Sequence, residues 1–400
     1  MKNFLPRPHY LKKIAPFIDQ DVIKVIIGQR RVGKSYFMYQ IMDALKKAHP
    51  KANIIYLNKE LYEFDHIKNY RHLVQHVEKR KAASGKNYIL IDEVQDIAQF
   101  EKALRHFQAE GGYDVYCTGS NAKMLSGDLA TYLSGRYVAM KIFGLSYPEF
   151  LSFHQMQDSA EAFLQYVRYG GLPYLLHLSK EDNIVYDYLR NVYNTILLKD
   201  IVARHRIRNV AFLENLVKFL ADNTGSVLSA KRISDFLKSQ KINMTPNVIL
   251  NYLAHLAAAF FIFKVPRAEI SGKKIFEIGD KYYFEDLGLR HTILPYQQKD
   301  INKVLENLVY THLAISGYDI AIGKIGNKEI DFVCTRGDEK LYVQVAYLIP
   351  DQRVWAREFD NLLAIQDNYP KMVVSMDEAI GKQYRGVAHI HIREFLRTYR

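Results

Sequence analysis

Short, nearly all-apolar runs alternate with amphipathic segments in the first third of the chain. The runs are Val22–Ile27, Asn53–Leu57, Tyr88–Ile91, Val115–Thr118 and Tyr137–Phe143, and the segments between them include Tyr36–Lys47 and Phe100–Ala109. Strands that alternate with helices indicate a parallel sheet, and a sheet covered on both faces needs strands that are apolar throughout. The pattern therefore predicts an α/β fold with a parallel sheet sandwiched between helices.

The pattern changes after this region. Strand signals stop between Tyr147 and about Arg206, where helical periodicity is broken only at Gly170–Pro173. Three helices and two strand-like runs follow, and the last hundred residues mix a helix (Leu305–Ile315) with strands at Ile330–Cys334 and Leu341–Tyr347. We therefore expect four parts: a parallel-sheet domain (1–146), a helical subdomain (147–206), a winged-helix-like domain (207–295) and an α+β domain (296–400).

The composition favours an anionic partner and argues against a signal peptide and a membrane span. The 55 basic and 43 acidic side chains give a net charge of +12, which favours an anionic partner such as nucleic acid, although a solvated basic surface explains it equally well. Cys117 and Cys334 stand in apolar runs and are expected to be buried thiols, which suits the cytoplasm. No signal peptide or membrane span is predicted, because the most apolar stretch, Tyr252–Val265, is too short to cross a bilayer.

One predicted strand ends in a glycine-rich turn that leads into a helix. The turn fits G-x-x-x-x-G-K-[ST] and comprises Gly28, Gln29, Arg30, Arg31, Val32, Gly33, Lys34 and Ser35. The N–H groups of such a loop, together with the helix N-terminus, surround phosphate oxygens. We expect Lys34 to neutralise phosphate charge and Ser35 to hold Mg²⁺. A basic turn with a structural role alone is the alternative.

A second strand runs into two adjacent carboxylates, Asp92 and Glu93. Ligands of parallel sheets bind at the carboxyl ends of the strands, so both acids are expected beside the glycine-rich loop. Asp92 would orient the water shell of Mg²⁺, and Glu93 would polarise the attacking water as general base. Acids are also common where a strand simply reaches solvent.

Further candidates follow the next strands. Ser120 and Asn121 end the run that begins at Val115, where either could touch the γ-phosphate or the attacking water; a loop without a catalytic part explains them equally well. Arg136 could bridge to phosphate charge, in its own subunit or in a neighbouring one.

The motifs GQRRVGKS, YILIDEVQDI, TGSNAKML and LSGRY, with Lys281–Arg290 and Leu305–Tyr310, resemble those of bacterial and archaeal AAA+-type ATPases that carry a C-terminal domain of unknown function. The resemblance covers nearly the whole chain. It implies an additional-strand P-loop sheet, ATP as the nucleotide, and Ser120 or Asn121 as the residue that senses the γ-phosphate. It implies an activity rather than a cellular role.

The third predicted part is similar to a winged helix. Ser229 would cap one helix, Thr245-Pro246 would start the recognition helix, and Ser271-Gly272 would turn the wing. DNA phosphates would meet Lys231, Arg232, Lys273 and Lys274, and bases would meet Asn247, Asn251 or His255. Such domains also serve as protein-docking spacers.

The last part has the spacing of a PD-(D/E)xK nuclease fold. Glu306, Asp331 and Gln344 stand at its metal-binding positions, but Gln344 replaces a carboxylate and Ala346 replaces the lysine. Glu329 stands close by but is expected on the opposite face of its strand. We therefore expect a nuclease-like domain without nuclease activity, since both the ligand charge and the ammonium are missing.

These features predict an ATP- and Mg²⁺-dependent AAA+-like ATPase whose nucleotide state controls binding of a macromolecule. An ATP-switched DNA-binding protein, an ATP-dependent nuclease and a protein-docking ATPase remain alternatives. A ring or dimer is required only if Arg136 acts in trans.

Overall fold

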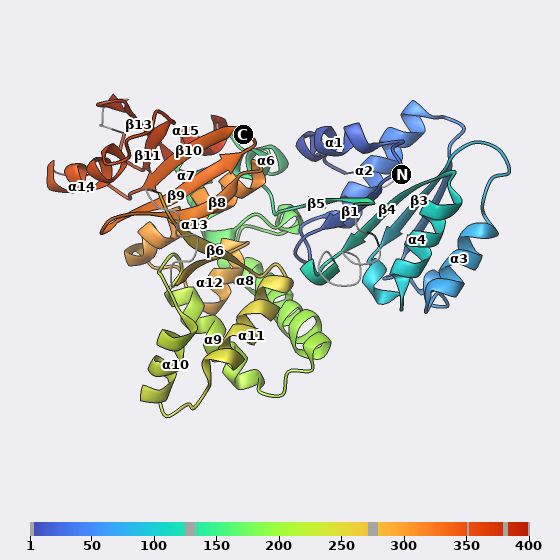
Figure 1. Ribbon diagram of the computed structural model, residues 1–400, viewed down its shortest axis with the longest axis horizontal. Coiled ribbons are helices and arrows are strands. Elements are labelled where there is room, and N and C mark those ends of the chain that lie inside the picture. The colour runs from blue at the N-terminus through green and yellow to red at the C-terminus, as the bar shows by residue number, and fades with distance from the viewer. Residues whose placement is uncertain are drawn as a thin grey trace. The chain divides into compact units, whose positions relative to one another are not determined.

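The computed structural model describes residues 4–124, 133, 135–270, 279–349, 352–378 and 383–398. The chain divides into two units, Met1–Phe143 with Ala258–Phe260, and Gly144–Ala257 with Phe261–Arg400. Figure 1 shows the elements of each unit. Short 3₁₀ helices occur at Ala15–Phe17, Tyr62–Phe64, Val94–Asp96, Ala122–Met124, Pro173–His177 and Gln298–Asp300.

The first unit is built on a five-stranded parallel sheet. Its strands are β1 (Ile23–Ile27), β2 (Asn53–Asn58), β3 (Asn87–Asp92), β4 (Tyr113–Gly119) and β5 (Tyr137–Lys141), in the spatial order β2-β3-β4-β1-β5. Because β4 pairs with both β1 and β3, it is the additional strand expected between them. The α/β P-loop sheet predicted from the apolar runs is confirmed, with strand ends that differ by at most two residues.

Helices cover both faces of this sheet. They are α1 (Pro8–Ile14), α2 (Lys34–Ala48), α3 (Tyr70–Glu78) and α4 (Phe100–Glu110). In Figure 1, α1 and α2 lie on one side of the strands, and α3 and α4 lie on the other. The chain must cross the sheet in opposite directions after β1 and after β2, so right-handed crossovers place the helices on opposite faces. Every residue of β1, β3 and β4 is accordingly buried.

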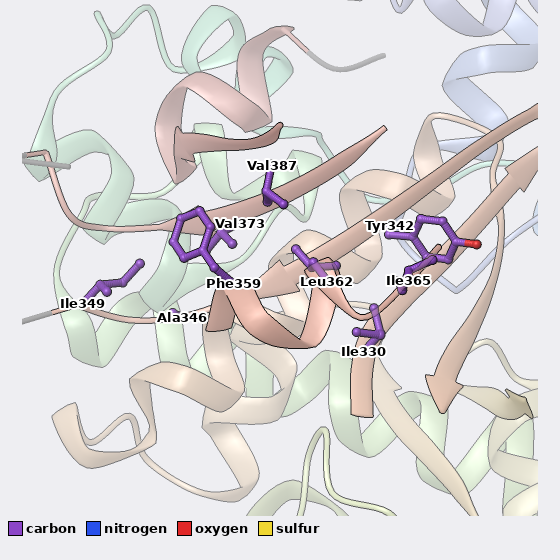
Figure 2. Close-up of a cluster of buried hydrophobic side chains, with 9 residues drawn as sticks. All are labelled: Ile330, Tyr342, Ala346, Ile349, Phe359, Leu362, Ile365, Val373 and Val387. Carbon is purple, nitrogen blue, oxygen red and sulfur yellow. The ribbon is translucent and has the colours of Figure 1, made fainter. Parts of the chain in front are cut away.

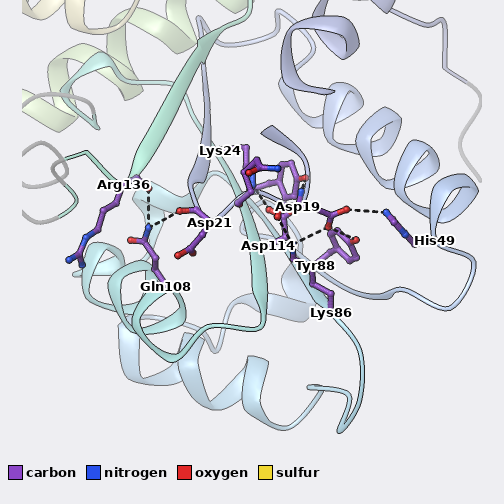
Figure 3. Close-up of polar contacts among 11 residues, drawn as sticks. Asp19, Asp21, Lys24, His49, Lys86, Tyr88, Gln108, Asp114 and Arg136 are labelled. Atoms are coloured by element: carbon purple, nitrogen blue, oxygen red, sulfur yellow. Dashed lines mark hydrogen bonds and ion pairs between the residues drawn. The ribbon is translucent and has the colours of Figure 1, made fainter. Parts of the chain in front are cut away.

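A polar network lies at the amino-terminal edge of the sheet (Figure 3). The ammonium of Lys24, near the start of β1, is paired with the carboxylate of Asp114, near the start of β4, and both are buried. The Tyr88 hydroxyl donates to Asp19 over 2.8 Å, and Lys86 forms an ion pair with the same carboxylate over 3.1 Å. These contacts tie the strand starts together at the edge opposite the glycine-rich loop.

The second unit begins with helices. They are α6 (Tyr147–Phe153), α7 (Ala160–Tyr169), α8 (Asp182–Thr195) with a π-helical continuation (Ile196–Ala203), α9 (Val210–Asp222), α10 (Ala230–Ser239) and α11 (Pro246–Ala258). The predicted cap of α10 is present, because the Ser229 hydroxyl accepts the N–H of Arg232 over 3.2 Å. Satisfying this otherwise unpaired donor defines where the helix starts.

An eight-stranded mixed sheet follows. Its strands are β6 (Ile262–Glu269), β7 (Asp280–Phe284), β8 (Asp319–Ile325), β9 (Lys328–Arg336), β10 (Glu339–Val345), β11 (Lys371–Ser375), β12 (Gln383–Tyr384) and β13 (Val387–His391), in the order β12-β13-β11-β10-β9-β8-β6-β7. The remaining helices are α12 (Leu287–Ile293), α13 (Ile301–Ile315), α14 (Gln352–Leu363) and α15 (Ile392–Thr398). Since β6 pairs with β8, the third and fourth predicted parts share one sheet, and the four-part division stays a prediction.

An apolar cluster fixes α14 against the C-terminal strands (Figure 2). Phe359 and Leu362 of α14 are fully buried, together with Tyr342, Val373 and Val387 from β10, β11 and β13. Within the described residues, both cysteines are free and buried, as expected. No helix in that part of the chain is long and apolar enough to cross a membrane.

Candidate nucleotide-binding site

The glycine-rich loop joins the end of β1 to the start of α2. Gly28 has no room for a side chain, because a Cβ there would lie 2.2 Å from the carbonyl oxygen of Ile142. Gly33 has a φ of 97°, in the left-handed region that favours glycine, and α2 begins at the next residue. Both glycines are therefore needed for the chain to turn from the strand into the helix at this point.

Lys34 connects the loop to the neighbouring strand end. Its side chain is 4% exposed, and its Nζ donates to the carbonyl oxygens of Gly28 and Gln29 over 3.0 Å each. The same ammonium lies 3.7 Å from the carboxylate of Glu93. The predicted phosphate-binding cation and the predicted general base are therefore neighbours.

Asp92 lies at the end of β3 and is completely buried. The Thr118 hydroxyl, near the end of β4, donates a hydrogen bond to its carboxylate, and the Ser35 side chain forms another. Burial raises the pKa of Asp92, while these two hydrogen bonds lower it. The residues that were expected to hold Mg²⁺, Ser35 and Asp92, thus interact with each other.

Glu93 has an unusual backbone conformation. Its φ of 56° and ψ of 53° are left-handed, which is uncommon for a residue with a side chain. Its N–H donates to the Thr118 hydroxyl over 2.9 Å, and the Gln95 amide donates to its carboxylate. A strained position at a strand end is typical of a functional site.

Thr118 was missed by the sequence reasoning, which chose Ser120 and Asn121 on the same strand end. Its hydroxyl touches both acids of the second motif, whereas Ser120 and Asn121 follow it and are buried. Among the described residues, the Ser120 hydroxyl has no hydrogen-bond partner. The alignment of the parallel strand ends could have indicated Thr118. Because Ile91 pairs with Cys117, the next residues, Asp92 and Thr118, lie side by side.

The other loop residues differ in exposure. Gln29 and Val32 are buried, and Arg30 is nearly so, with its guanidinium 3.4 Å from Glu60. Arg31 is exposed and has a φ of 72°. Of the two arginines, Arg31 therefore has the freer side chain for an incoming anion.

Arg136 lies away from this cluster. It directly precedes β5, whose first residue, Tyr137, pairs with Ile23 at the start of β1. Arg136 is therefore at the amino-terminal edge of the sheet, where Figure 3 places it near Gln108, and not beside the phosphate loop of its own chain. A role in a neighbouring subunit stays a prediction.

Two family models match the chain. Residues 20–151 match an AAA domain, and residues 160–300 match a domain of unknown function (DUF8612). An uncharacterized protein of Haemophilus influenzae is 35% identical over 408 residues and covers 99% of both chains. The chain carries an AAA domain and belongs to the same family as this relative. Another uncharacterized relative of this AAA-domain protein, from Methanocaldococcus jannaschii, is 30% identical over 84% of this chain and 79% of its own.

Solved structures of low similarity also match this AAA-domain protein. One is the Aeropyrum pernix Orc1 protein in complex with DNA, at 11% identity and a TM-score of 0.33, covering 73% of this chain and 93% of that one. Another is Cdc6p from Pyrobaculum aerophilum, at 10% identity and the same TM-score, covering 77% and 97%. At this TM-score the likeness does not bear on what the AAA-domain protein binds.

Proposed function

We propose that this protein binds and hydrolyses ATP with Mg²⁺ at the carboxyl edge of the five-stranded sheet. The supporting observation is the 3.7 Å approach of Lys34 to Glu93, next to Asp92, which interacts with Ser35. Lys34 and Ser35 stand in the first turn of α2, directly after the loop that follows β1, and Asp92 and Glu93 stand at the end of β3. Ligands of parallel sheets bind at this edge.

Each side chain has one task in this proposal. Lys34 exchanges its carbonyl partners for β- and γ-phosphate oxygens, and the loop N–H groups bind the same phosphates. Ser35 and Asp92 hold Mg²⁺, which polarises the γ-phosphate when bound. Glu93 accepts a proton from the attacking water. The two hydrogen bonds of Thr118 keep Glu93 beside Asp92.

Lys34→Ala tests the binding site. The loss of a charge-assisted phosphate contact should weaken ATP binding by at least about a hundredfold, measured by calorimetric titration. Lys46→Ala, an exposed lysine on the same helix, is the matched control and should bind normally. Unchanged ATP affinity of Lys34→Ala would exclude this site.

Glu93→Gln tests the proposed general base. This variant should keep ATP affinity but slow phosphate release by about a hundredfold or more.

We further propose that the nucleotide state controls binding of DNA by segment 207–285. Two observations support this: α9, α10 and α11 are followed by the antiparallel pair β6–β7, and Leu228 bridges to Asp280 as a third strand would. This order is that of a winged helix. The predicted wing residues Lys273 and Lys274 lie outside the described residues.

The candidate DNA contacts on α10 and α11 are accessible. Lys231, Arg232, Asn247 and Asn251 are exposed, whereas His255 is half-buried. Lys231 and Arg232 stand in the first turn of α10, beyond its Ser229 cap, so two adjacent cations face solvent.

The double variant Lys231→Ala/Arg232→Ala tests DNA binding. Two lost phosphate contacts should lower duplex affinity roughly tenfold and reduce the slope of log K against log salt by about 2, measured by fluorescence anisotropy. Lys218→Ala, an exposed lysine of α9, should change neither quantity. A wild-type protein that binds no DNA at low salt, with or without ATP, would contradict the DNA proposal and leave the ATPase proposal intact.

A further inference from the structure

A cavity of about 550 Å³ lies beside the C-terminal sheet. Its lining includes Glu306 of α13, Asp331 of β9, Gln344 of β10 and Glu358 of α14. Three of these residues stand at the positions whose spacing predicted a nuclease-like metal site. The structure therefore brings the predicted positions together at one cavity.

A lysine from outside the predicted motif enters this cluster. Lys281 of β7 has a side chain that is only 4% exposed, and its Nζ lies 2.8 Å from Glu306, 2.9 Å from Glu329 and 3.4 Å from Asp331. The expectation that Glu329 points away is wrong, because strand residues two positions apart share a face. Burial lowers the pKa of Lys281, but the three carboxylates outweigh burial and raise it, so the ammonium stays charged.

Other protein donors also reach these carboxylates. Asp331 Oδ2 accepts the N–H of Val345 over 2.9 Å, and the Glu306 Oε1 that contacts Lys281 also accepts from the Tyr283 hydroxyl. Gln344 is held on both sides, because its amide donates to Glu358 over 3.0 Å and its oxygen accepts the N–H of Asp331 over 3.3 Å. The neutral amide thus belongs to a hydrogen-bonded network and does not point free into the cavity.

A divalent cation bridging Glu306 Oε1 and Asp331 Oδ1 would need the position that the Lys281 ammonium holds. Two cations cannot share that position, because their repulsion in a buried site is larger than in water. We propose that Lys281 is a built-in counter-ion that replaces the divalent cation in this acid cluster, so that the cavity does not take up Mg²⁺ or Mn²⁺. The cluster is then a structural ion network and not the metal centre of a nuclease.

Removing the ammonium exposes the charges that it compensates. Three carboxylates would remain around one buried point, and their mutual repulsion destabilises the fold unless a proton or a cation replaces the lysine. Glu306 already shows this tendency, since burial and the charge of Asp331 raise its pKa to about 7. Lys281→Met should therefore create a site for a divalent cation where wild type has none.

Mn²⁺ uptake tests the proposal. It would be measured by electron paramagnetic resonance on nucleotide-free, full-length protein carrying Asp92→Asn, which removes the candidate metal ligand of the ATP site. Protein with Lys281 should take up no Mn²⁺, whereas Lys281→Met should take up one ion and gain several degrees in Tm from it. Lys264→Met, an exposed lysine on the neighbouring strand, is the control and should behave like the parent.

The outcomes separate clearly. Mn²⁺ bound by the parent and lost in Asp331→Asn would overturn the proposal, and so would a folded Lys281→Met protein that neither binds Mn²⁺ nor loses stability. If Lys281→Met does not fold in EDTA, refolding with Mn²⁺ should recover it, and failure to do so would also overturn the proposal. Glu329→Gln, which keeps Lys281 and two partners, should fold and take up no ion.

Discussion

At the residue scale, one hydroxyl joins the two acids of the candidate site. Thr118 donates to Asp92 and accepts from the backbone of Glu93, so it helps to fix the distance between the proposed metal ligand and the proposed base. Neither acid can shift alone without breaking one of these bonds. The orientation of the site therefore depends on a residue that does not itself take part in the proposed reaction.

Thr118→Val should lower the hydrolysis rate roughly ten- to a hundredfold, the effect of losing one hydrogen bond to a buried charge. It should also raise the Mg²⁺ concentration that gives half the maximal rate, because Asp92 would lose its fixed orientation. Phosphate release measured over a Mg²⁺ series checks both effects. Thr118→Ser keeps the hydroxyl and should restore wild-type behaviour; a Thr118→Val protein with unchanged Mg²⁺ dependence would exclude the positioning role.

At the element scale, an acidic pair before α12 holds two distant loops. Asp286 caps α12 by accepting the N–H of Leu289 over 2.9 Å, and it also accepts the N–H of Gly171 over 2.7 Å. Glu285 accepts the N–H of Gly144 over 2.7 Å. The glycines leave room for this approach, since a Cβ on Gly170 would lie 2.4 Å from Asp286. The motif Lys281–Arg290 therefore organises the second unit.

The stability of the protein should depend on the protonation of Asp286. Burial raises its pKa from an ordinary 3.8 to about 6, although its backbone hydrogen bonds lower it. The folded state thus binds the proton more tightly than the unfolded state, so the contribution is fully present below about pH 4 and is lost as pH rises through about 6. The total change is on the order of 3 kcal/mol.

Urea unfolding of wild type and Asp286→Asn between pH 4 and pH 8 checks this. Because the asparagine amide does not titrate, the pH dependence of the difference between the two proteins reports Asp286. The free energy of unfolding of wild type, minus that of the variant, should fall between about pH 4 and pH 6 and stay level above pH 7. A difference that rises over the same interval would mean that Asp286 is ionised in the folded protein at lower pH than its burial implies.

At the scale of the whole molecule, the proposed function requires that two ligands influence each other. If ATP changes the affinity for DNA by some factor, DNA must change the affinity for ATP by the same factor. The net charge of +12 would add a salt-dependent contribution to the proposed DNA binding, and this contribution would not depend on nucleotide.

We expect a five- to fiftyfold change in duplex affinity upon addition of Mg²⁺-ATP to Glu93→Gln protein, within the usual range of coupling free energies. Anisotropy titrations with and without nucleotide measure one side of the cycle, and ATP titrations with and without duplex measure the other. Lys34→Ala is the control and should show no change. Equal DNA affinity in the presence and absence of ATP would contradict nucleotide control.

Local patterns were enough to predict the first sheet and its loop. The apolar runs marked β1 to β5, and the glycine spacing marked a strand-to-helix turn, because backbone geometry allows few residue types there. Neighbouring residues encode these features, so the chain determines them without reference to distant parts. The spacing of Glu306, Asp331 and Gln344 likewise indicated residues that meet in one cavity.

Only the tertiary structure decided which distant groups meet. Thr118 became part of the candidate site through the register of parallel strands, Arg136 was placed at the opposite sheet edge, and Lys281 entered the acid cluster from another strand. No local sequence pattern predicts such contacts, because each contact depends on the pairing of strands that lie far apart in the sequence. The amino-acid sequence by itself determined the elements of the first sheet and the glycine-rich loop. Strand pairing determined the neighbours of each charged group, and those neighbours set its chemistry.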